Sequence, residues 1–296
     1  NASRTLLLNI ESLQWDETLA NCFAIPLDAL PSVVPSRHHY GYLDLPDYHI
    51  PLQLLNGDQS AALFAHGSPD PDRLYINLGT GAFVQRLIEQ PIAEAQQLLS
   101  SVVWQDAARV KYVLEGTVNG AACALQQVAE ELALGMTEVE QQAAQWLSQI
   151  GEIPLFMNSV SGIGSPYWRS DLVSHFIGDG EPWQKMVAVF ESILFLLNEN
   201  INEMARYTSP ALSIQVSGGL ANNDAFCQRL ADLTELSVIR PSQCEATAQG
   251  VAFLLTDMQH DWELEPVTRF EPREDRVLME RYQRWRVALS AWLSAG

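Results

Sequence analysis

The sequence predicts an α/β fold, in which helices flank a sheet. The chain has 296 residues and a hydrophobic fraction of 47%, which is enough to fill a substantial core. Its C-terminal part alternates apolar runs that suit strands with amphipathic runs that suit helices, an alternation typical of α/β domains. The elements expected there are a strand at 212–216, a turn at Gly218 and Gly219, a helix at 222–236, a strand at 238–239 and a helix at 246–258.

The rest of the chain predicts further elements in order. Residues 5–23 suit a short strand and then a helix, whereas the five prolines from Pro26 to Pro51 inclusive favour loops and short strands. Apolar residues recur at three- or four-residue steps in 183–206 and in 271–294, so each segment is expected to form a helix with a buried stripe. The other expected elements are a helix at 58–65, strands at 74–78, 82–87, 98–104 and 110–114, and helices at 120–134 and 137–150.

Composition restricts the class of partner. A net charge of −19 argues against nucleic acid and anionic membrane surfaces, whose phosphates the chain would repel, so a small or metal-bound partner is expected. No apolar stretch approaches the roughly 20 residues that span a bilayer. The cysteines form no CxxC pair, and the histidines show no spacing typical of metal ligands. A reduced, cytoplasmic protein is therefore expected, with no metal site made by its own side chains.

The segment Asn56-Gly57-Asp58-Gln59 places a carboxylate at an expected helix start. The positive end of a helix favours an ionised carboxylate, which can orient an attacking hydroxyl and accept its proton. Phosphoryl transfer through a loose transition state needs such positioning more than it needs a strong base. The alternative is that Asp58 only caps the helix, and the local sequence alone favours that alternative.

A glycine hairpin follows at Gly79, Thr80 and Gly81. Glycines let backbone N–H groups approach phosphate oxygens closely, and the threonine adds a hydroxyl. The alternative is an ordinary β-turn, since three such residues are weak evidence. Phe83, two residues on, is by default a buried strand aromatic, although it would form an apolar wall for a hydroxylated substrate beside Asp58.

A second glycine motif, Gly218 and Gly219, precedes Asn222 and Asn223. Glycines at a strand-to-helix turn admit a ribose or base, and asparagine amides can bond to it. A tight turn with a helix cap is the alternative. Residues 247–250 open the next helix and could close the same pocket. The loop 162–168 suits a wall or gate, and its alternative is a structural turn that buries Trp168.

In order and spacing, the chain resembles the FGGY-type carbohydrate kinases, the glycerol kinase group in particular. The segments that carry the resemblance are 1–5, 56–59, 78–81, 114–117, 161–168 and 217–220. The resemblance extends over essentially the whole chain. It implies an actin-like ATPase (ribonuclease H-like) lobe with a mixed central sheet, in which residues 1–55 end the N-terminal lobe and 56–296 form the C-terminal lobe.

The resemblance also implies roles and ligands. Asp58 would be the catalytic base of an ATP-dependent kinase, with Gln59 and Phe83 against a small polyol or sugar. Gly79, Thr80 and Gly81 would bind the γ-phosphate of ATP. Mg²⁺ would arrive with the nucleotide. Assembly into a homodimer is compatible with the resemblance. The residues implied to contact adenosine are Gly218, Gly219, Asn222 and Asn223.

Several departures from the family pattern shape the expectations. The phosphate loop of the first lobe is absent, so we expect a truncated chain that transfers phosphate negligibly alone. Ser217 stands where the family commonly has an acidic residue or glycine, and Arg169 stands where an acidic residue is usual. The segment 171–182 is shorter than in the family. The segment 44–51 lacks the insertion through which bacterial relatives are feedback-inhibited. A non-catalytic actin-like module that binds nucleotide or protein is therefore an alternative. An unrelated α/β protein is a third interpretation, which the ordered matches disfavour.

Overall fold

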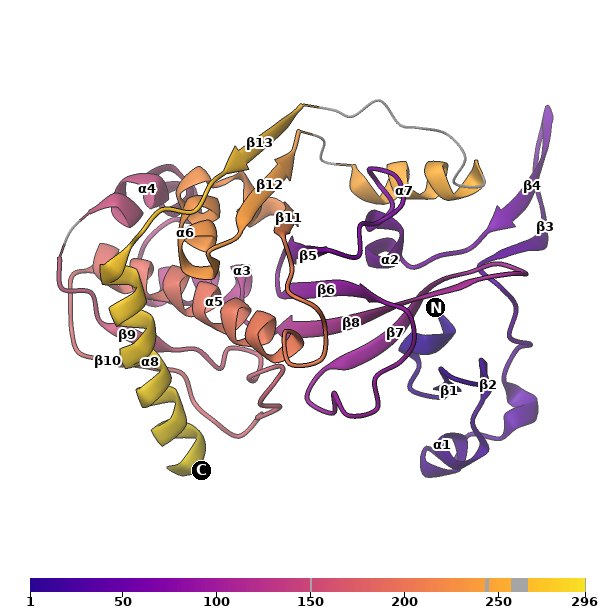
Figure 1. Cartoon of the computed structure of the whole chain (residues 1–296), viewed down its shortest axis with the longest axis horizontal. Coiled ribbons are helices and arrows are strands. Elements are labelled where there is room, and N and C mark those ends of the chain that lie inside the picture. Colours follow the sequence, from indigo (N-terminus) through magenta and orange to yellow (C-terminus); the bar gives the residue numbers. More distant parts are fainter. Residues whose placement is uncertain (150, 243–244, 257–265, 296) are drawn as a thin grey trace. The chain divides into compact units, whose positions relative to one another are not determined.

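The computed structural model describes residues 1–149, 151–242, 245–256 and 266–295. Its main feature is a seven-stranded mixed sheet with the order β13-β12-β11-β5-β6-β8-β7 (Figure 1). Strand β11 is parallel to both β5 and β12, whereas β5–β6, β7–β8 and β12–β13 are antiparallel. The predicted α/β class with a mixed sheet is confirmed. The strands are β5 (Arg73–Leu78), β6 (Ala82–Ile88), β7 (Leu99–Gln105), β8 (Val110–Val118), β11 (Ser213–Ser217), β12 (Ser237–Pro241) and β13 (Val267–Phe270).

The described residues form two compact units. The first contains 1–71, 86–115 and 245–256, and the second contains 72–85, 116–149, 151–242 and 266–295. Each unit therefore draws on segments that are distant in the sequence. None of the helices among the described residues combines the length and the apolar character that a bilayer crossing requires.

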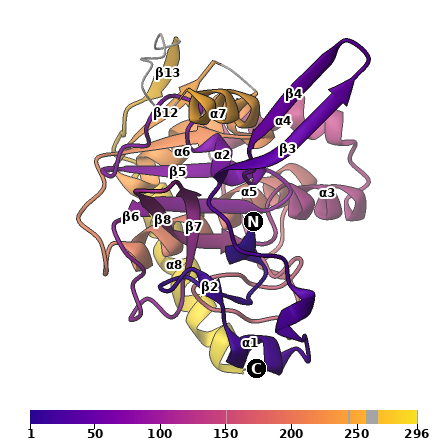
Figure 2. The ribbon, with the colours of Figure 1, turned by 90° about the vertical axis from the view of Figure 1, so that its right-hand side faces the viewer.

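The first unit opens with short elements and a long hairpin. The helix expected within 5–23 is α1, whose N-cap Asp16 accepts a hydrogen bond from the Leu19 N–H at 3.0 Å. The short strands expected between the prolines are instead a long ribbon, β3–β4 (Figure 2). Pro51 is tolerated there because both strands of a two-stranded ribbon have an outer edge that needs no ladder donor. The elements are η1 (Ala2–Arg4), β1 (Leu8–Asn9), β2 (Gln14–Trp15), α1 (Glu17–Cys22), η2 (Leu27–Ala29), β3 (Arg37–Leu45) and β4 (Tyr48–Leu54).

Two helices of the first unit, α2 (Asp58–Ala62) and α7 (Ala246–Leu255), pack closely against each other. The backbone of α2 approaches Gly250 so closely that a Cβ there would lie 1.7 Å from the carbonyl oxygen of Ala61. No side chain fits such a gap. Glycine at position 250 therefore fixes the distance between α7 and the helix that begins at Asp58.

We expect Gly250→Ala to destabilise the protein. Glycine to alanine normally stabilises a helix by about 0.5–1 kcal/mol, but here overpacking should cost about 1–3 kcal/mol of unfolding free energy. Urea denaturation of the variant measures this. Gly135→Ala is a control without overpacking, because a Cβ at that position meets no heavy atom within 4 Å. Gly135 is the N-cap of α4, where alanine is less favourable than glycine, so this control should lose no more than about 1 kcal/mol. Equal stabilities for the two variants would contradict the close α2–α7 packing.

The second unit is organised around α5 (Pro182–Met204). Every residue from Met186 to Asn198 is buried, and α5 packs against the helices α3, α4 and α6 and the strand β9. The predicted stripe is confirmed, with only Trp183 half-buried. The C-terminal helix α8 also buries most of its apolar stripe, with Trp292 half-buried, and packs on β9. The remaining elements are α3 (Ala122–Glu131), α4 (Met136–Ser148), β9 (Leu155–Met157), β10 (His175–Ile177), η3 (Gly219–Asn222), α6 (Asp224–Thr234) and α8 (Arg276–Ala295).

A buried charge cluster joins three helices of this unit. Glu191 on α5 is 1% exposed and accepts hydrogen bonds from Arg229 of α6 and Arg281 of α8. The same guanidinium groups also donate to the carbonyl oxygens of Leu147 and Ile153. One carboxylate thus binds α5, α6 and α8 to one another.

Candidate active site

The structure brings the two glycine motifs of the second unit together. Strands β5 and β11 are parallel neighbours, with Asn77 opposite Ser217, so both strands end at the same edge of the sheet. Gly218 has φ +92°, and a Cβ there would lie 2.5 Å from the Leu78 carbonyl oxygen. The turn after β11 therefore lies directly against the start of the Gly79–Gly81 hairpin. In open α/β sheets, this edge is where ligands bind.

The hairpin is held from behind by the start of α3. The Gly79 N–H donates to the Gly81 carbonyl at 2.9 Å, while the N–H groups of Ala121 and Ala122 donate to the Thr80 and Gly79 carbonyls at 3.2 Å. These bonds use carbonyl oxygens of the turn and one of its donors, the Gly79 N–H. Thr80 itself is exposed. The hairpin is thus fixed in place and presents its tip outward, a geometry that suits phosphate binding by backbone donors.

Phe83 and Ser217 lie on one face of the sheet beside the turns. Asn77 on β5 is opposite both Phe83 on β6 and Ser217 on β11, and opposed residues share a face. The Asn77 amide donates to the Ser217 hydroxyl at 3.2 Å. Ser217, a departure from the family pattern, therefore has a hydrogen-bond partner on the neighbouring strand. Phe83 is half-buried, so it belongs neither to the core nor to the fully exposed surface.

The asparagines after the second glycine motif have different roles. Asn222 ends η3 and is exposed, whereas Asn223 caps α6 by accepting a hydrogen bond from the Phe226 N–H at 3.0 Å. Beneath η3, Arg240 donates to the Ala221 carbonyl oxygen at 2.8 Å. The cap anticipated as the alternative is thus present at Asn223, and the turn rests on a fixed support.

Asp58 and Gln59 lie in the first unit. Gly57 occupies the N-cap position of α2 and Asp58 is the first helical residue, so the expectation that Asp58 is the cap was wrong by one position. Its Oδ1 accepts the Gln59 N–H at 2.8 Å, and the side chain is exposed. Thr247 of α7 donates to the Asp58 carbonyl oxygen at 3.2 Å, a contact that the sequence did not predict. Gln59 is half-buried.

The loop 162–168 is anchored to β8 and α5. A Cβ on Gly164 would lie 2.3 Å from the Thr117 carbonyl oxygen, and the Ser165 hydroxyl donates to Asn200 at 2.7 Å. Trp168 is 44% exposed, so the alternative that this turn buries it was wrong. Arg169, the other departure, donates to Asp171 at 2.6 Å and 2.7 Å, and this hydrogen-bonded ion pair lowers the pKa of Asp171 to about 2.

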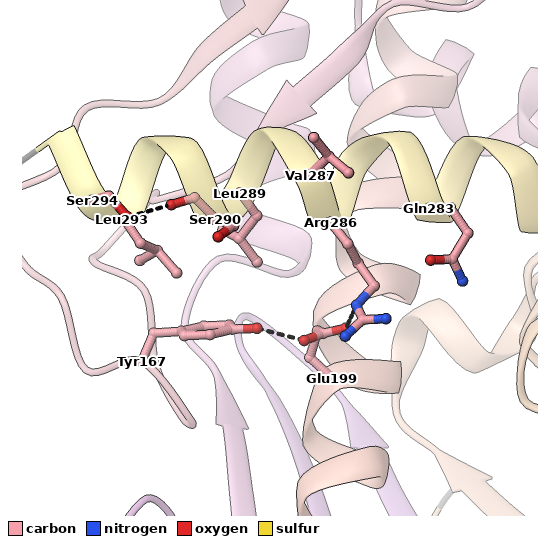
Figure 3. A pocket seen from close by; sticks show the side chains of 9 residues that line it. All are labelled: Tyr167, Glu199, Gln283, Arg286, Val287, Leu289, Ser290, Leu293 and Ser294. Carbon is pink, nitrogen blue, oxygen red and sulfur yellow. Dashed lines mark hydrogen bonds and ion pairs between the residues drawn. The ribbon is translucent and has the colours of Figure 1, made fainter.

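A pocket of about 510 Å³ that the sequence did not predict lies along α8 (Figure 3). At its wall, Glu199 accepts hydrogen bonds from Tyr167 at 2.5 Å and from Tyr282, and Arg286 lies 3.0 Å away. Burial, and then the bond to Glu199, raises the pKa of Tyr167 far above its ordinary value. Glu199 of α5 thus binds Tyr282 and Arg286 of α8 and Tyr167 of the loop 162–168.

Metal-ligating side chains do not cluster in the described ranges, 1–149, 151–242, 245–256 and 266–295. Within them, no three His, Cys, Asp or Glu side chains gather as a metal site. Cys22, Cys123 and Cys227 are free, and Cys244 lies outside the described residues.

The sequence matches two domain models of one family. The C-terminal domain of the FGGY family of carbohydrate kinases matches residues 74–256, and its N-terminal domain matches residues 1–64. Among curated relatives, a glycerol kinase from Synechocystis sp. is 35% identical over 266 residues, which cover 86% of this chain and 54% of that protein. A glycerol kinase from Shewanella frigidimarina is 34% identical, with 86% and 52% covered. The chain thus spans about half the length of these relatives.

Solved structures of kinases share the fold. The crystal structure of Plasmodium falciparum glycerol kinase with ADP has a TM-score of 0.85 at 24% identity, covering 99% of this chain and 62% of that one. A ligand-bound xylulose kinase from Lactobacillus acidophilus has a TM-score of 0.76 at 19% identity, covering 98% and 63%. At these identities the likeness concerns the fold, and it confirms the predicted actin-like ATPase architecture.

Proposed function

The chain belongs to the FGGY family of carbohydrate kinases, and from this premise we propose that it is part of a cytoplasmic, ATP-dependent kinase for glycerol or another small polyol or sugar. The observation that carries the proposal is the pair of glycine turns at the ends of β5 and β11, where Gly218 lies against Leu78. Two adjacent turns with exposed backbone suit a ligand with a phosphate chain and a nucleoside. The family relationship specifies the reaction type.

The nucleotide would lie across both turns. Gly79, Thr80 and Gly81 are proposed to bind the γ-phosphate, and Gly218 and Gly219 the adenosine. Asn222 is exposed and free to turn toward a ribose or base, whereas the cap formed by Asn223 limits that residue to its amide N–H₂ group. Mg²⁺ bound to ATP would neutralise charge on the transferred phosphoryl group.

Asp58 is proposed as the general base, with Gln59 and Phe83 in contact with the polyol. Its exposed carboxylate on the first turn of α2 supports this role, because a substrate hydroxyl can reach it. The alcohol proton would pass to an Asp58 carboxylate oxygen as the alcohol oxygen bonds to the γ-phosphorus of ATP, while the bond between that phosphorus and the β,γ-bridging oxygen breaks and ADP leaves. The half-buried ring of Phe83 offers an apolar surface for the carbon side of a polyol.

The two family domains divide this chain unequally. We propose that residues 1–55 end the N-terminal lobe and that 56–296 form the C-terminal lobe; the matched ranges 1–64 and 74–256 support a division in this region. The phosphate loop of the family belongs to the first lobe. We therefore expect residues 1–296 alone to transfer phosphate negligibly, and activity is to be tested in the complete protein.

The direct test measures ADP formation by the complete protein with glycerol, xylulose and other polyols and sugars. Turnover that depends on one small polyol or sugar would support the proposal. Binding of Mg-ATP without turnover on any member of the panel would instead favour the non-catalytic nucleotide-binding alternative. Absence of both binding and turnover would contradict both functions.

A pair of glycine variants tests the nucleotide site separately. We expect Gly218→Ala to lower the unfolding free energy by about 1–3 kcal/mol, because φ is +92° and the Leu78 backbone leaves no room. A Cβ on Gly219 meets no heavy atom within 4 Å, so Gly219→Ala should fold normally. If adenosine approaches Gly219, Gly219→Ala should still weaken Mg-ADP binding about tenfold, equivalent to about 1.4 kcal/mol. Calorimetric titration and thermal denaturation measure the two effects, and unchanged affinity in Gly219→Ala would remove that residue from the site.

A further inference from the structure

Two residues of the segments that resemble the family, Arg4 and Glu115, have no part in the proposed reaction, yet they form a fixed ion pair. The Nη1 and Nη2 groups of Arg4 donate to the two oxygens of Glu115, each at 2.8 Å. The Glu115 side chain is 1% exposed, whereas Arg4 is 38% exposed. Such a two-point pair fixes the plane of the guanidinium as well as its position. Arg4 therefore has one face fixed on a buried carboxylate and another open to solvent.

The segment that carries Arg4 and the segment that carries Asp58 are fixed to one strand. The Ser3 hydroxyl donates to the Val102 carbonyl oxygen at 3.3 Å, and the Asn56 amide donates to the Val103 carbonyl oxygen at 3.2 Å. These are consecutive residues of β7. Because β7 pairs with β8, which carries Glu115, a single hairpin determines where both segments lie.

The two segments also approach each other directly. The Oδ1 atom of Asn1, at the start of η1, lies 3.6 Å from the point where a Cβ on Gly57 would be. Gly57 immediately precedes Asp58. The pKa of Arg4 is consistent with this arrangement: the hydrogen bond to Glu115 is the main cause that raises it, partial burial opposes the rise, and the charges of Glu115 and, last, of Asp58 add to it.

We propose that Arg4, held by Glu115, is a positioning residue that orients the Asp58 carboxylate toward the substrate hydroxyl. The inference rests on the proposed kinase function, because that function gives Asp58 the role of general base. An exposed carboxylate on a five-residue helix has few restraints of its own. A fixed cation nearby restricts its rotamers, and small errors of position are costly for a reacting group.

The test is a double-mutant cycle in the complete protein with glycerol, or the best substrate of the panel, and Mg-ATP. We expect Arg4→Met to lower kcat about 10- to 100-fold, with KM values for both substrates unchanged within about threefold. Arg4→Lys, which keeps the charge but loses the fork, should lie between wild type and Arg4→Met. Arg109→Met, which alters an exposed arginine in the turn of the same hairpin, is the control and should keep full activity.

The cycle distinguishes positioning from a structural role. If Arg4 acts through Asp58, adding Arg4→Met to Asp58→Asn should change kcat less than about threefold. A full additional loss would overturn the inference and leave the kinase proposal intact. Normal turnover in Asp58→Asn alone would instead overturn the base assignment on which the inference rests.

A second variant covers the risk that Arg4→Met leaves Glu115 buried without its cation and prevents folding. Arg4→Met combined with Glu115→Leu removes both charges, and such replacements are commonly tolerated. A folded double variant should show the same loss of kcat as Arg4→Met. Full activity in that variant would overturn the inference, because the cation would then be dispensable.

Discussion

Asp58→Asn in the complete protein should reduce kcat by about 10²- to 10⁴-fold, the range that general acid–base catalysis commonly contributes. Asparagine has nearly the same shape and can still interact with the start of α2, where Asp58 Oδ1 now accepts the Gln59 N–H. Its amide cannot accept the alcohol proton. The affinity for Mg-ATP should change little, because the glycine turns are proposed to hold the nucleotide. Steady-state kinetics and calorimetric titration measure the two quantities.

The matched control for this variant is Asp47→Asn. Asp47 is an exposed residue in the β3–β4 turn of the same unit and has no proposed role. The Asp47→Asn substitution removes the same charge as Asp58→Asn and should leave kcat unchanged. If Asp58→Asn turned over substrate as fast as Asp47→Asn does, Asp58 would not be the base.

Glu191→Gln should cost about 3–5 kcal/mol of unfolding free energy, the range seen when one partner of a buried ion pair is removed. The substitution leaves the guanidinium groups of Arg229 and Arg281, which are 17% and 9% exposed, without their shared anion. Since 1 kcal/mol corresponds to about 2–4 °C in a protein of this size class, the melting temperature should fall on the order of 10 °C. Differential scanning calorimetry of the chain measures this.

Two further variants identify the cause. Glu140→Gln, on the exposed side of α4, makes the same chemical change without buried partners and should shift the melting temperature by less than about 2 °C. Glu191→Leu combined with Arg281→Leu should be more stable than Glu191→Leu alone, because fewer uncompensated charges stay buried. Equal melting temperatures for Glu191→Gln and Glu140→Gln would contradict the structural role of this cluster.

Local signals predicted most of the elements. Periodic apolar residues identified α5 and α8, and glycine turns flanked by apolar runs identified β5, β6 and β11. The short strands β9, β10 and β13 were missed, because three or four residues carry too little pattern. The helices predicted at 137–150 and 246–258 end at residues 150 and 257–258, which lie outside the described residues. The β3–β4 ribbon was predicted only as loops and short strands, since frequent prolines hide the pairing along a ribbon whose edges are open.

In the candidate site, too, the sequence predicted the types of residue but not their contacts. The residue types at Asp58, Gly79–Gly81 and Gly218–Gly219 indicate carboxylate and phosphate chemistry, because that chemistry depends on side-chain identity and on the absence of a Cβ. The proximity of Gly218 to Leu78, of Gly250 to Ala61 and of Arg4 to Glu115 was not predictable. Each pair is separated by more than 100 positions, and no local period records it.

The amino-acid order was thus sufficient for the α/β class and for most helices and strands, since each depends on neighbours within a few positions. The order and spacing of motifs along the whole chain carried the resemblance to the FGGY kinases. The folded chain was needed to show which carbonyl oxygens approach Gly218 and Gly250, which cations share Glu191, and which strand holds both Ser3 and Asn56. Those contacts form between distant segments, and packing of the whole core determines them.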